Sequence, residues 1–164
     1  RCSTGMQKKV DFIFSIVHHP KLLLLDEPSA SVDMMSQKKM NEDLMKFMEN
    51  GENSIIIATH LQEEVKQMSD YVYILDKGKI INSFEKDEVR ELWARLWVTS
   101  IPNSIKTHPN VVEVSSSLQQ IVTNNLPALQ EQLRREDLTI TNTQRLELNE
   151  VITYMIEGVK GSQI

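Results

Sequence analysis

Four consecutive leucines, Leu22–Leu25, lead directly into Asp26, Glu27 and Pro28. A short unbroken apolar run is typical of a β-strand that is buried on both faces, as in a parallel sheet. Proline donates no backbone hydrogen bond, so Pro28 ends the predicted strand. The two acids therefore stand at the carboxyl end of a buried strand, which is where ligands bind in open α/β sheets.

Further strands are predicted along the same half of the chain. Residues 54–58 form a second continuous apolar run, and Thr59 and His60 follow it as the two acids follow the first. A third strand is predicted at 71–75, with a turn at 76–79 and a return strand to Phe84. Helices are predicted between the strands, and a strand–helix–strand order implies a parallel sheet with right-handed crossovers.

The carboxyl edge of such a sheet would bring Asp26, Glu27 and His60 together. A rigid carboxylate there can bind Mg²⁺, which usually accompanies phosphates, and a second acid can orient or deprotonate a water molecule. The acids could instead be solvated residues at a turn, and His60 could be a helix cap. Two strands that deliver reactive groups to one edge favour a shared site.

A helix is also predicted at the start of the chain. One apolar stripe runs along it: Val10, Ile13, Phe14 and Val17. Ser3 or Thr4 is a suitable N-cap, and Gly5 permits close approach to the backbone. A helix N-terminus with small residues can bind phosphate, although an ordinary capped surface helix would explain the same residues.

Composition restricts the remaining possibilities. A net charge of −5 over 164 residues argues against a nucleic-acid-binding surface. Cys2 is the only cysteine, so no internal disulfide or thiol metal cluster is expected. No apolar run approaches the roughly 18 residues of a membrane span, and no signal peptide is recognisable. The chain starts at Arg1 within a helical pattern, and we interpret it as a fragment of a longer protein.

Residues 85–164 carry no pattern that suggests chemistry. Helices are predicted at 85–93, 127–135 and 148–158, and strands at 96–99, 111–114, 120–123 and 138–141. This mixture predicts a small α+β appendage that could dimerise, regulate or only pack.

Several motifs resemble those of one family. Residues 2–7, Cys-Ser-Thr-Gly-Met-Gln, look like the signature motif usually written LSGGQ, and residues 22–27 match a Walker B strand with its adjoining acid. Residues 29–33 look like a D-loop, and His60 stands where a switch histidine belongs. Together, residues 1–84 resemble the second half of the nucleotide-binding subunit of ATP-binding-cassette (ABC) transporters. The Ser-x-Gly-Met form of the signature is familiar in the exporter branch (bacitracin/multidrug type).

The resemblance implies a fold, cofactors and site residues. The expected fold class is α/β: residues 1–84 form part of a P-loop NTPase (ABC ATPase) core with mainly parallel buried strands, and residues 85–164 form the small α+β extension. ATP and Mg²⁺ are the implied cofactors. Asp26 would help hold the metal, Glu27 would be the general base, and His60 would contact the γ-phosphate. The remaining site residues would complete the nucleotide site of a facing subunit: Ser3, Thr4, Gly5, Met6 and Asp33.

The implied partners are an integral membrane permease subunit and a second nucleotide-binding subunit, in a homo- or heterodimer, and no nucleic acid. The implied location is peripheral, on the cytoplasmic face of the cell membrane. No G-x-x-x-x-G-K-[ST] phosphate loop occurs in the chain. In the family that loop precedes the signature, so we expect these residues alone to bind ATP poorly and to be inactive. Alternatives are a soluble ABC-type ATPase acting on nucleic acid or ribosomes, and a catalytically silent interaction fragment.

Overall fold

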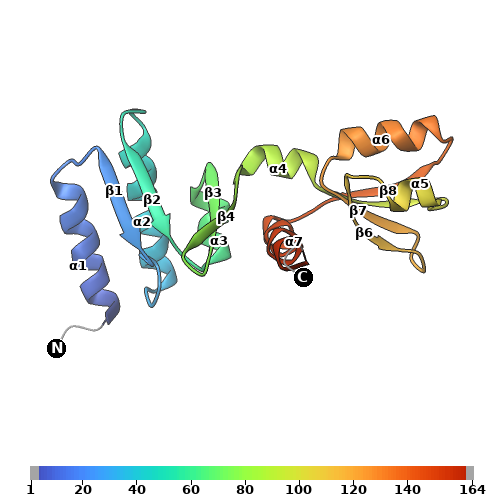
Figure 1. The fold of residues 1–164 in the computed structure, drawn as a ribbon. Coiled ribbons are helices and arrows are strands. Elements are labelled where there is room, and N and C mark those ends of the chain that lie inside the picture. The colour runs from blue at the N-terminus through green and yellow to red at the C-terminus, as the bar shows by residue number, and fades with distance from the viewer. Residues whose placement is uncertain (1–3, 162–164) are drawn as a thin grey trace. The chain divides into compact units, whose positions relative to one another are not determined.

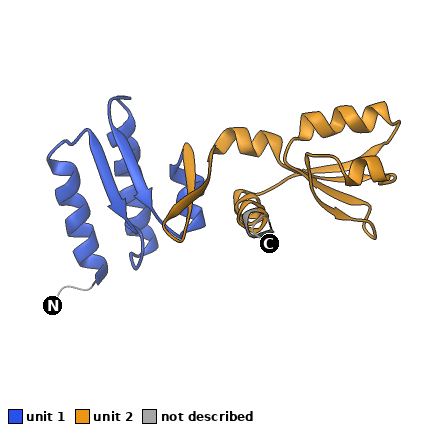
Figure 2. Cartoon of the chain, viewed as in Figure 1, with its two compact units in different colours: residues 1–69 blue, residues 70–164 orange. Residues whose placement is uncertain are grey.

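The computed structural model describes residues 4–161. The chain forms two compact units, residues 1–69 and residues 70–164 (Figure 2). This boundary places the 71–85 hairpin with the C-terminal residues. The resemblance puts a domain boundary at residue 84 instead, and that boundary remains a prediction.

The described part of unit 1 contains three helices and two strands (Figure 1). In chain order they are α1 (Thr4–Val17), β1 (Leu22–Asp26), α2 (Met34–Met48), β2 (Ser54–Ala58) and α3 (Gln62–Met68). The strands β1 and β2 pair in parallel, with Leu22 opposite Ser54 and Asp26 opposite Ala58. This confirms the predicted strand–helix–strand unit and aligns the carboxyl ends of the two strands.

One face of this strand pair is buried and the other is not. Leu23 and Leu25 of β1 pack with Ile55 and Ile57 of β2 against the helices of unit 1. The outer face is exposed within the described chain: Leu22, Leu24 and Ile56. The prediction that the strand is buried on both faces was therefore wrong. Side chains alternate along a strand, and the packed helices cover only one face.

The helix α1 departs from its sequence pattern in the same way. The predicted apolar stripe, Val10, Ile13, Phe14 and Val17, is exposed. Phe12 and Ile16 contact the core instead, because α1 is apolar on more than one side. The helix α2 buries Met40 and Leu44, and Gly51 adopts a positive φ of 68° just after the helix, as a C-terminal glycine does.

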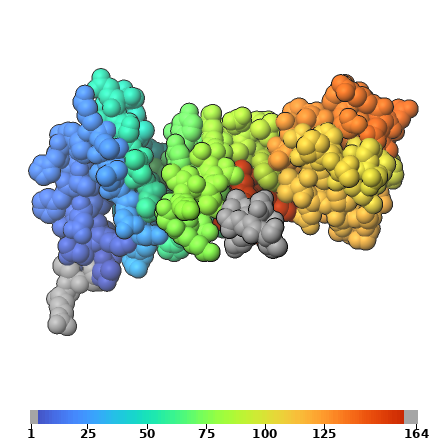
Figure 3. All heavy atoms as spheres, in the orientation of Figure 1, coloured from blue at the N-terminus to red at the C-terminus, as the bar shows by residue number. Residues whose placement is uncertain are grey.

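Unit 2 begins with a hairpin of β3 (Tyr71–Asp76) and β4 (Lys79–Glu85). Lys77 and Gly78 both have positive φ, as a two-residue hairpin turn requires. Among the described residues, β3 pairs only with β4, so it does not extend the parallel pair as predicted. The two-residue turn places β4 directly beside β3 as an antiparallel neighbour. The hairpin is green in Figure 3. Four of its apolar side chains are exposed: Tyr71, Tyr73, Leu75 and Ile80.

The rest of unit 2 is an α+β structure. Its elements are α4 (Lys86–Leu92), β5 (Ala94–Val98), α5 (Asn103–Lys106), β6 (Val111–Ser115), β7 (Gln120–Thr123), α6 (Leu126–Arg135), β8 (Ile140–Arg145) and α7 (Leu148–Gly161). The strands form one antiparallel sheet in the order β6-β7-β5-β8. Its core is apolar: Ala94, Leu96, Val98, Ile101, Ile105, Ile121, Leu126, Leu129 and Leu133.

The predicted mixed α/β class is thus observed, but the described strands are not mainly parallel. Of these strands only β1 and β2 pair in parallel, and the other described pairs are antiparallel. In the described part of the chain, no helix is both long and apolar enough to cross a membrane.

Candidate functional site

The carboxyl ends of β1 and β2 hold Glu27 and His60 in contact. The ladder extends one residue past β1, because the Glu27 backbone N–H donates to the carbonyl of Ala58 at 2.8 Å. Glu27 then turns the chain with a positive φ of 47°, which is uncommon for a residue other than glycine. Its carboxylate Oε1 accepts from the His60 backbone N–H at 3.2 Å and lies 2.6 Å from His60 Nδ1.

This contact assigns a role to one imidazole nitrogen. An ionised carboxylate only accepts hydrogen bonds, so in a contact with ionised Glu27 Nδ1 of His60 is the donor, and Nε2 takes no part in the contact. The His60 side chain is 73% exposed and that of Glu27 is 32% exposed. The second carboxylate oxygen, Glu27 Oε2, is buried and has no partner among the described residues. A water molecule or a ligand can therefore reach this pair at the exposed His60 ring.

Asp26 lies beside this pair as the last residue of β1, opposite Ala58. It is exposed and, in the part of the chain that the structure describes, makes no side-chain hydrogen bond or ion pair. Within residues 4–161 no group of three or more His, Cys, Asp or Glu side chains is placed to hold a metal ion. A metal at Asp26 would therefore need ligands from water or from a bound phosphate, as Mg²⁺ commonly uses.

The N-terminus of α1 opens onto a separate, shallow cavity. Its volume is about 410 Å³, and its lining includes Thr4, Gly5, Met6, Lys9, Ser31 and Asp33. The first turn of α1 contains no acidic residue. The helix dipole favours an anion at such a terminus. Ser3, predicted to act here, lies outside the described residues.

Gly5 permits α1 to touch the loop between β1 and α2. A Cβ atom at this position would lie 2.6 Å from the backbone oxygen of Ser31. That distance is too short for any side chain, and the obstacle is backbone. Glycine is therefore required for this approach. The Ser31 backbone is itself left-handed, with a φ of 65°.

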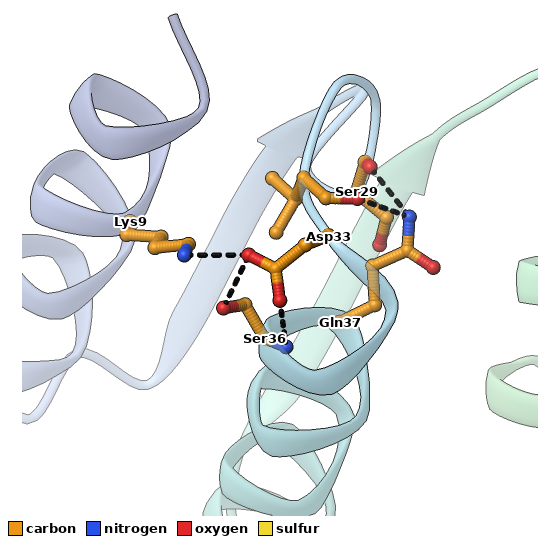
Figure 4. Close-up of polar contacts among 6 residues, drawn as sticks. Lys9, Ser29, Asp33, Ser36 and Gln37 are labelled. Carbon is orange, nitrogen blue, oxygen red and sulfur yellow. Dashed lines mark hydrogen bonds and ion pairs between the residues drawn. The ribbon is translucent and has the colours of Figure 1, made fainter. Parts of the chain in front are cut away.

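Asp33 is an N-cap in this structure (Figure 4). Its carboxylate accepts from the Ser36 backbone N–H at 3.0 Å, from the Ser36 hydroxyl at 2.8 Å and from Lys9 Nζ at 2.7 Å. The hydrogen bond from Lys9, followed by those from Ser36, holds the pKa of Asp33 far below its usual range. Asp33 is therefore ionised at neutral pH, and it links α1 to α2.

The loop is held from inside as well. The Gln37 side-chain amide donates to the carbonyls of Ser29 and Val32, at 3.0 and 2.9 Å. The Ser29 hydroxyl donates to Glu64 Oε1 at 2.6 Å. Lys9, Gln37 and Glu64 were not predicted from the sequence as neighbours of the site. Gln37 stands four residues after the cap, one helical turn, which is the signal that could have identified it.

The structure therefore brings the predicted residues together in two places. Glu27 and His60 touch, with Asp26 adjacent in sequence. Thr4, Gly5, Met6 and Asp33 line one cavity. Their chemical roles remain predictions.

Comparison with known proteins relates this chain to ATP-binding proteins of ABC transporters. One such relative, from Methanocaldococcus jannaschii, is 36% identical over 80 residues, which are 49% of this chain and 30% of that protein. The energy-coupling factor transporter ATP-binding protein EcfA2 of Streptococcus pyogenes is 38% identical over 81 residues, 49% of this chain and 29% of its own length. The molybdenum import ATP-binding protein ModC of Vibrio vulnificus is 28% identical over 176 residues, 96% of this chain and 48% of its own.

These relatives support the predicted resemblance to ABC ATP-binding subunits. They do not identify an exporter, and one of them is named for import. The chain spans less than half the length of each of these three relatives. No protein-family model matches the chain.

Proposed function

We propose that this chain supplies the hydrolytic half of a nucleotide site in a transport-coupled ATPase. The observation that carries this proposal is the contact of Glu27 with His60 at the carboxyl ends of two parallel strands. The ABC transporter relatives support it, because they are named as ATP-binding proteins.

Each residue has a proposed role in that reaction. Glu27 accepts the proton of the attacking water, and His60 Nδ1–H holds its carboxylate in place while Nε2 faces outward. Bound Mg²⁺ would neutralise phosphate charge, and Asp26 would hold it directly or through water. The N-terminus of α1, with Thr4, Gly5 and Met6, would receive the phosphates of a nucleotide bound to a second subunit.

The partners and the location follow from the same proposal. A second nucleotide-binding subunit would face the α1 cavity, with Asp33 at the junction between the subunits. A membrane permease would be driven when the two nucleotide-binding subunits close on each other. The protein would then work at the cytoplasmic face of the membrane. Export is favoured by the Ser-x-Gly-Met form of residues 3–6. Import is the second candidate, because a relative that aligns with 96% of this chain is named for molybdenum import.

The test uses the protein encoded by the complete reading frame that contains these residues. Glu27→Gln keeps the size of the side chain and removes the base, so turnover of MgATP should fall by roughly 10²-fold or more while ATP binding is kept. Glu52→Gln, at an exposed acid in the turn before β2, should leave turnover unchanged. Unchanged turnover in Glu27→Gln would overturn the assignment of the base. A wild-type protein that binds MgATP without hydrolysing it would favour the silent alternative.

A further inference from the structure

Glu64 is an unusual residue within α3. It is 6% exposed, whereas its neighbour Glu63 is exposed. The Oε1 atom of Glu64 accepts from the Ser29 hydroxyl at 2.6 Å, and Oε2 is buried without a partner among the described residues. Within those residues no lysine, arginine or histidine forms an ion pair with it. A buried polar oxygen without a hydrogen-bond partner costs stability, so stability alone does not account for Glu64.

Its partner is also buried. Ser29 is 5% exposed, and its carbonyl accepts from the Gln37 amide at 3.0 Å. Both ends of this residue are therefore fixed, the hydroxyl by α3 and the carbonyl by α2. Because both its hydroxyl and its carbonyl are hydrogen-bonded, Ser29 fixes the position of the chain just after Glu27.

Both residues lie beyond the carboxyl ends of the two parallel strands. Ser29 comes two residues after Glu27, and Glu64 comes four residues after His60. The backbone ladder between the two segments ends where Glu27 donates to Ala58. Beyond that point, in the described chain, side chains join the two segments: Glu27 bonds to His60, and Ser29 bonds to Glu64.

The Glu27–His60 contact needs such support. His60 is largely exposed, and a contact between exposed side chains is weak by itself. Glu27 also keeps a left-handed backbone, a conformation that persists when surrounding contacts determine it. Its carbonyl accepts from Lys8 Nζ at 2.5 Å and from the Ala30 N–H at 3.2 Å. The buried Ser29–Glu64 hydrogen bond fixes the residues that follow Glu27 to α3.

We propose that Glu64 is a positioning residue: through its hydrogen bond to Ser29, it keeps the segment carrying Glu27 in register with the segment carrying His60. This inference rests on the proposed function for its effect on turnover. Glu64 lies outside the predicted motifs. The proposal also gives the Ser29 hydroxyl a role in positioning Glu27 and His60.

The experiment compares Ser29→Ala and Glu64→Ala in the complete protein. Each should lower kcat for MgATP at least about tenfold with KM within about twofold, because small misplacement of a base costs rate more than binding. The double variant should be no worse than either single variant, since both remove one bond. Glu64→Gln keeps an acceptor oxygen and should restore at least half of the wild-type kcat. Glu63→Ala is the matched control on α3 and should leave kcat unchanged.

A second readout does not depend on turnover. In the same protein labelled with ¹⁵N at histidine, the Nδ1 signal of His60 should report a protonated nitrogen bonded to a carboxylate. In Ser29→Ala it should move toward the value of a free imidazole. Ser29→Ala removes a single oxygen atom, so it decides the question even if Glu64→Ala does not fold.

The outcomes separate the two proposals. If the wild type hydrolyses ATP and Glu27→Gln does not, but Ser29→Ala keeps kcat and the His60 signal, the positioning role is overturned and the proposed function stands. A loss of kcat that only follows loss of folded protein also overturns it. If the wild type does not hydrolyse ATP, the proposed function fails, and the His60 signal alone decides whether Ser29 and Glu64 position the pair.

Discussion

Nδ1 of His60 lies 2.6 Å from Oε1 of Glu27, and the same oxygen accepts from the backbone N–H of His60. A residue just after β2 thus fixes the acid that follows β1 through both its ring and its main chain. Both bonds meet at this one carboxylate oxygen, so together they hold it against the start of the segment that follows β2.

Removal of the ring should therefore cost turnover without removing the acid. His60→Ala leaves the backbone N–H bond and deletes the imidazole. We expect kcat for MgATP in the complete protein to fall by up to roughly a hundredfold, as when a catalytic group is slightly misplaced. His18→Ala, at an exposed histidine after α1, is the control. Equal kcat in both variants would show that the ring does not orient Glu27.

Gly5 should resist any side chain. In Gly5→Ala the new Cβ would meet the Ser31 oxygen at 2.6 Å, so the α1 terminus and the loop must separate. We expect the free energy of unfolding to fall by about 1–3 kcal/mol, measured by urea titration with circular dichroism. A Cβ added at Gly158 in α7 would have nothing within 4 Å, and Gly158→Ala should stabilise by about 0.5–1 kcal/mol. A neutral Gly5→Ala would contradict the close approach.

Asp33 should give a pH-dependent contribution to stability. Its pKa is lowered in the folded chain, chiefly by the hydrogen bond from Lys9. Because this pKa is lowered in the folded chain, ionised Asp33 stabilises the folded chain at pH values above its ordinary pKa of 3.8. That stabilisation is lost as the pH falls below 3.8. Asp33→Asn keeps a capping oxygen but loses the charge. Its melting temperature should be lower than that of the wild type at neutral pH by a few degrees, on the order expected for an exposed pair.

The pH series provides the check on that interpretation. The difference between Asp33→Asn and the wild type should shrink as pH falls from about 4 toward about 2. Asp33→Ala also loses the cap, so part of its deficit should persist at low pH. A deficit of Asp33→Asn that is independent of pH would show that the charge plays no part.

The 164-residue chain by itself should bind MgATP weakly. It contains the proposed hydrolytic residues but no G-x-x-x-x-G-K-[ST] loop to hold the β- and γ-phosphates. Isothermal titration should show no binding with a Kd below about 1 mM. Sub-millimolar binding would contradict this expectation.

Most elements could be predicted from the sequence because their signals are local. Residues 22–26 and 54–58 are mainly continuous apolar runs, and Gly51 and Gly78 mark the helix end and the hairpin turn that they occupy in the structure. The meeting of Glu27 with His60 could also be predicted, because parallel strands align their carboxyl ends. The predicted hairpin of β3 with β4 is confirmed. The predicted place of β3 in the parallel sheet was wrong among the described residues, since periodicity does not reveal which strands pair across a sheet.

Burial was harder to predict than secondary structure. A run of four leucines fits a strand covered on both faces or on one, and only the packing of the helices decides between them. The buried Glu64 was missed for a related reason: in the sequence it is one of two adjacent acids on a short helix. Its hydrogen bond joins residues 35 positions apart, and no local pattern records that separation.

The outer face of β1 and β2 has a practical consequence for work with this chain. Leu22, Leu24 and Ile56 form an apolar surface on a two-stranded sheet, and the strand edges can accept further strands. Samples of these residues should therefore self-associate as concentration rises and should enhance the fluorescence of hydrophobic dyes. Light scattering should be measured in every ligand titration, so that a signal from ligand binding is distinguished from a signal caused by self-association of the chain.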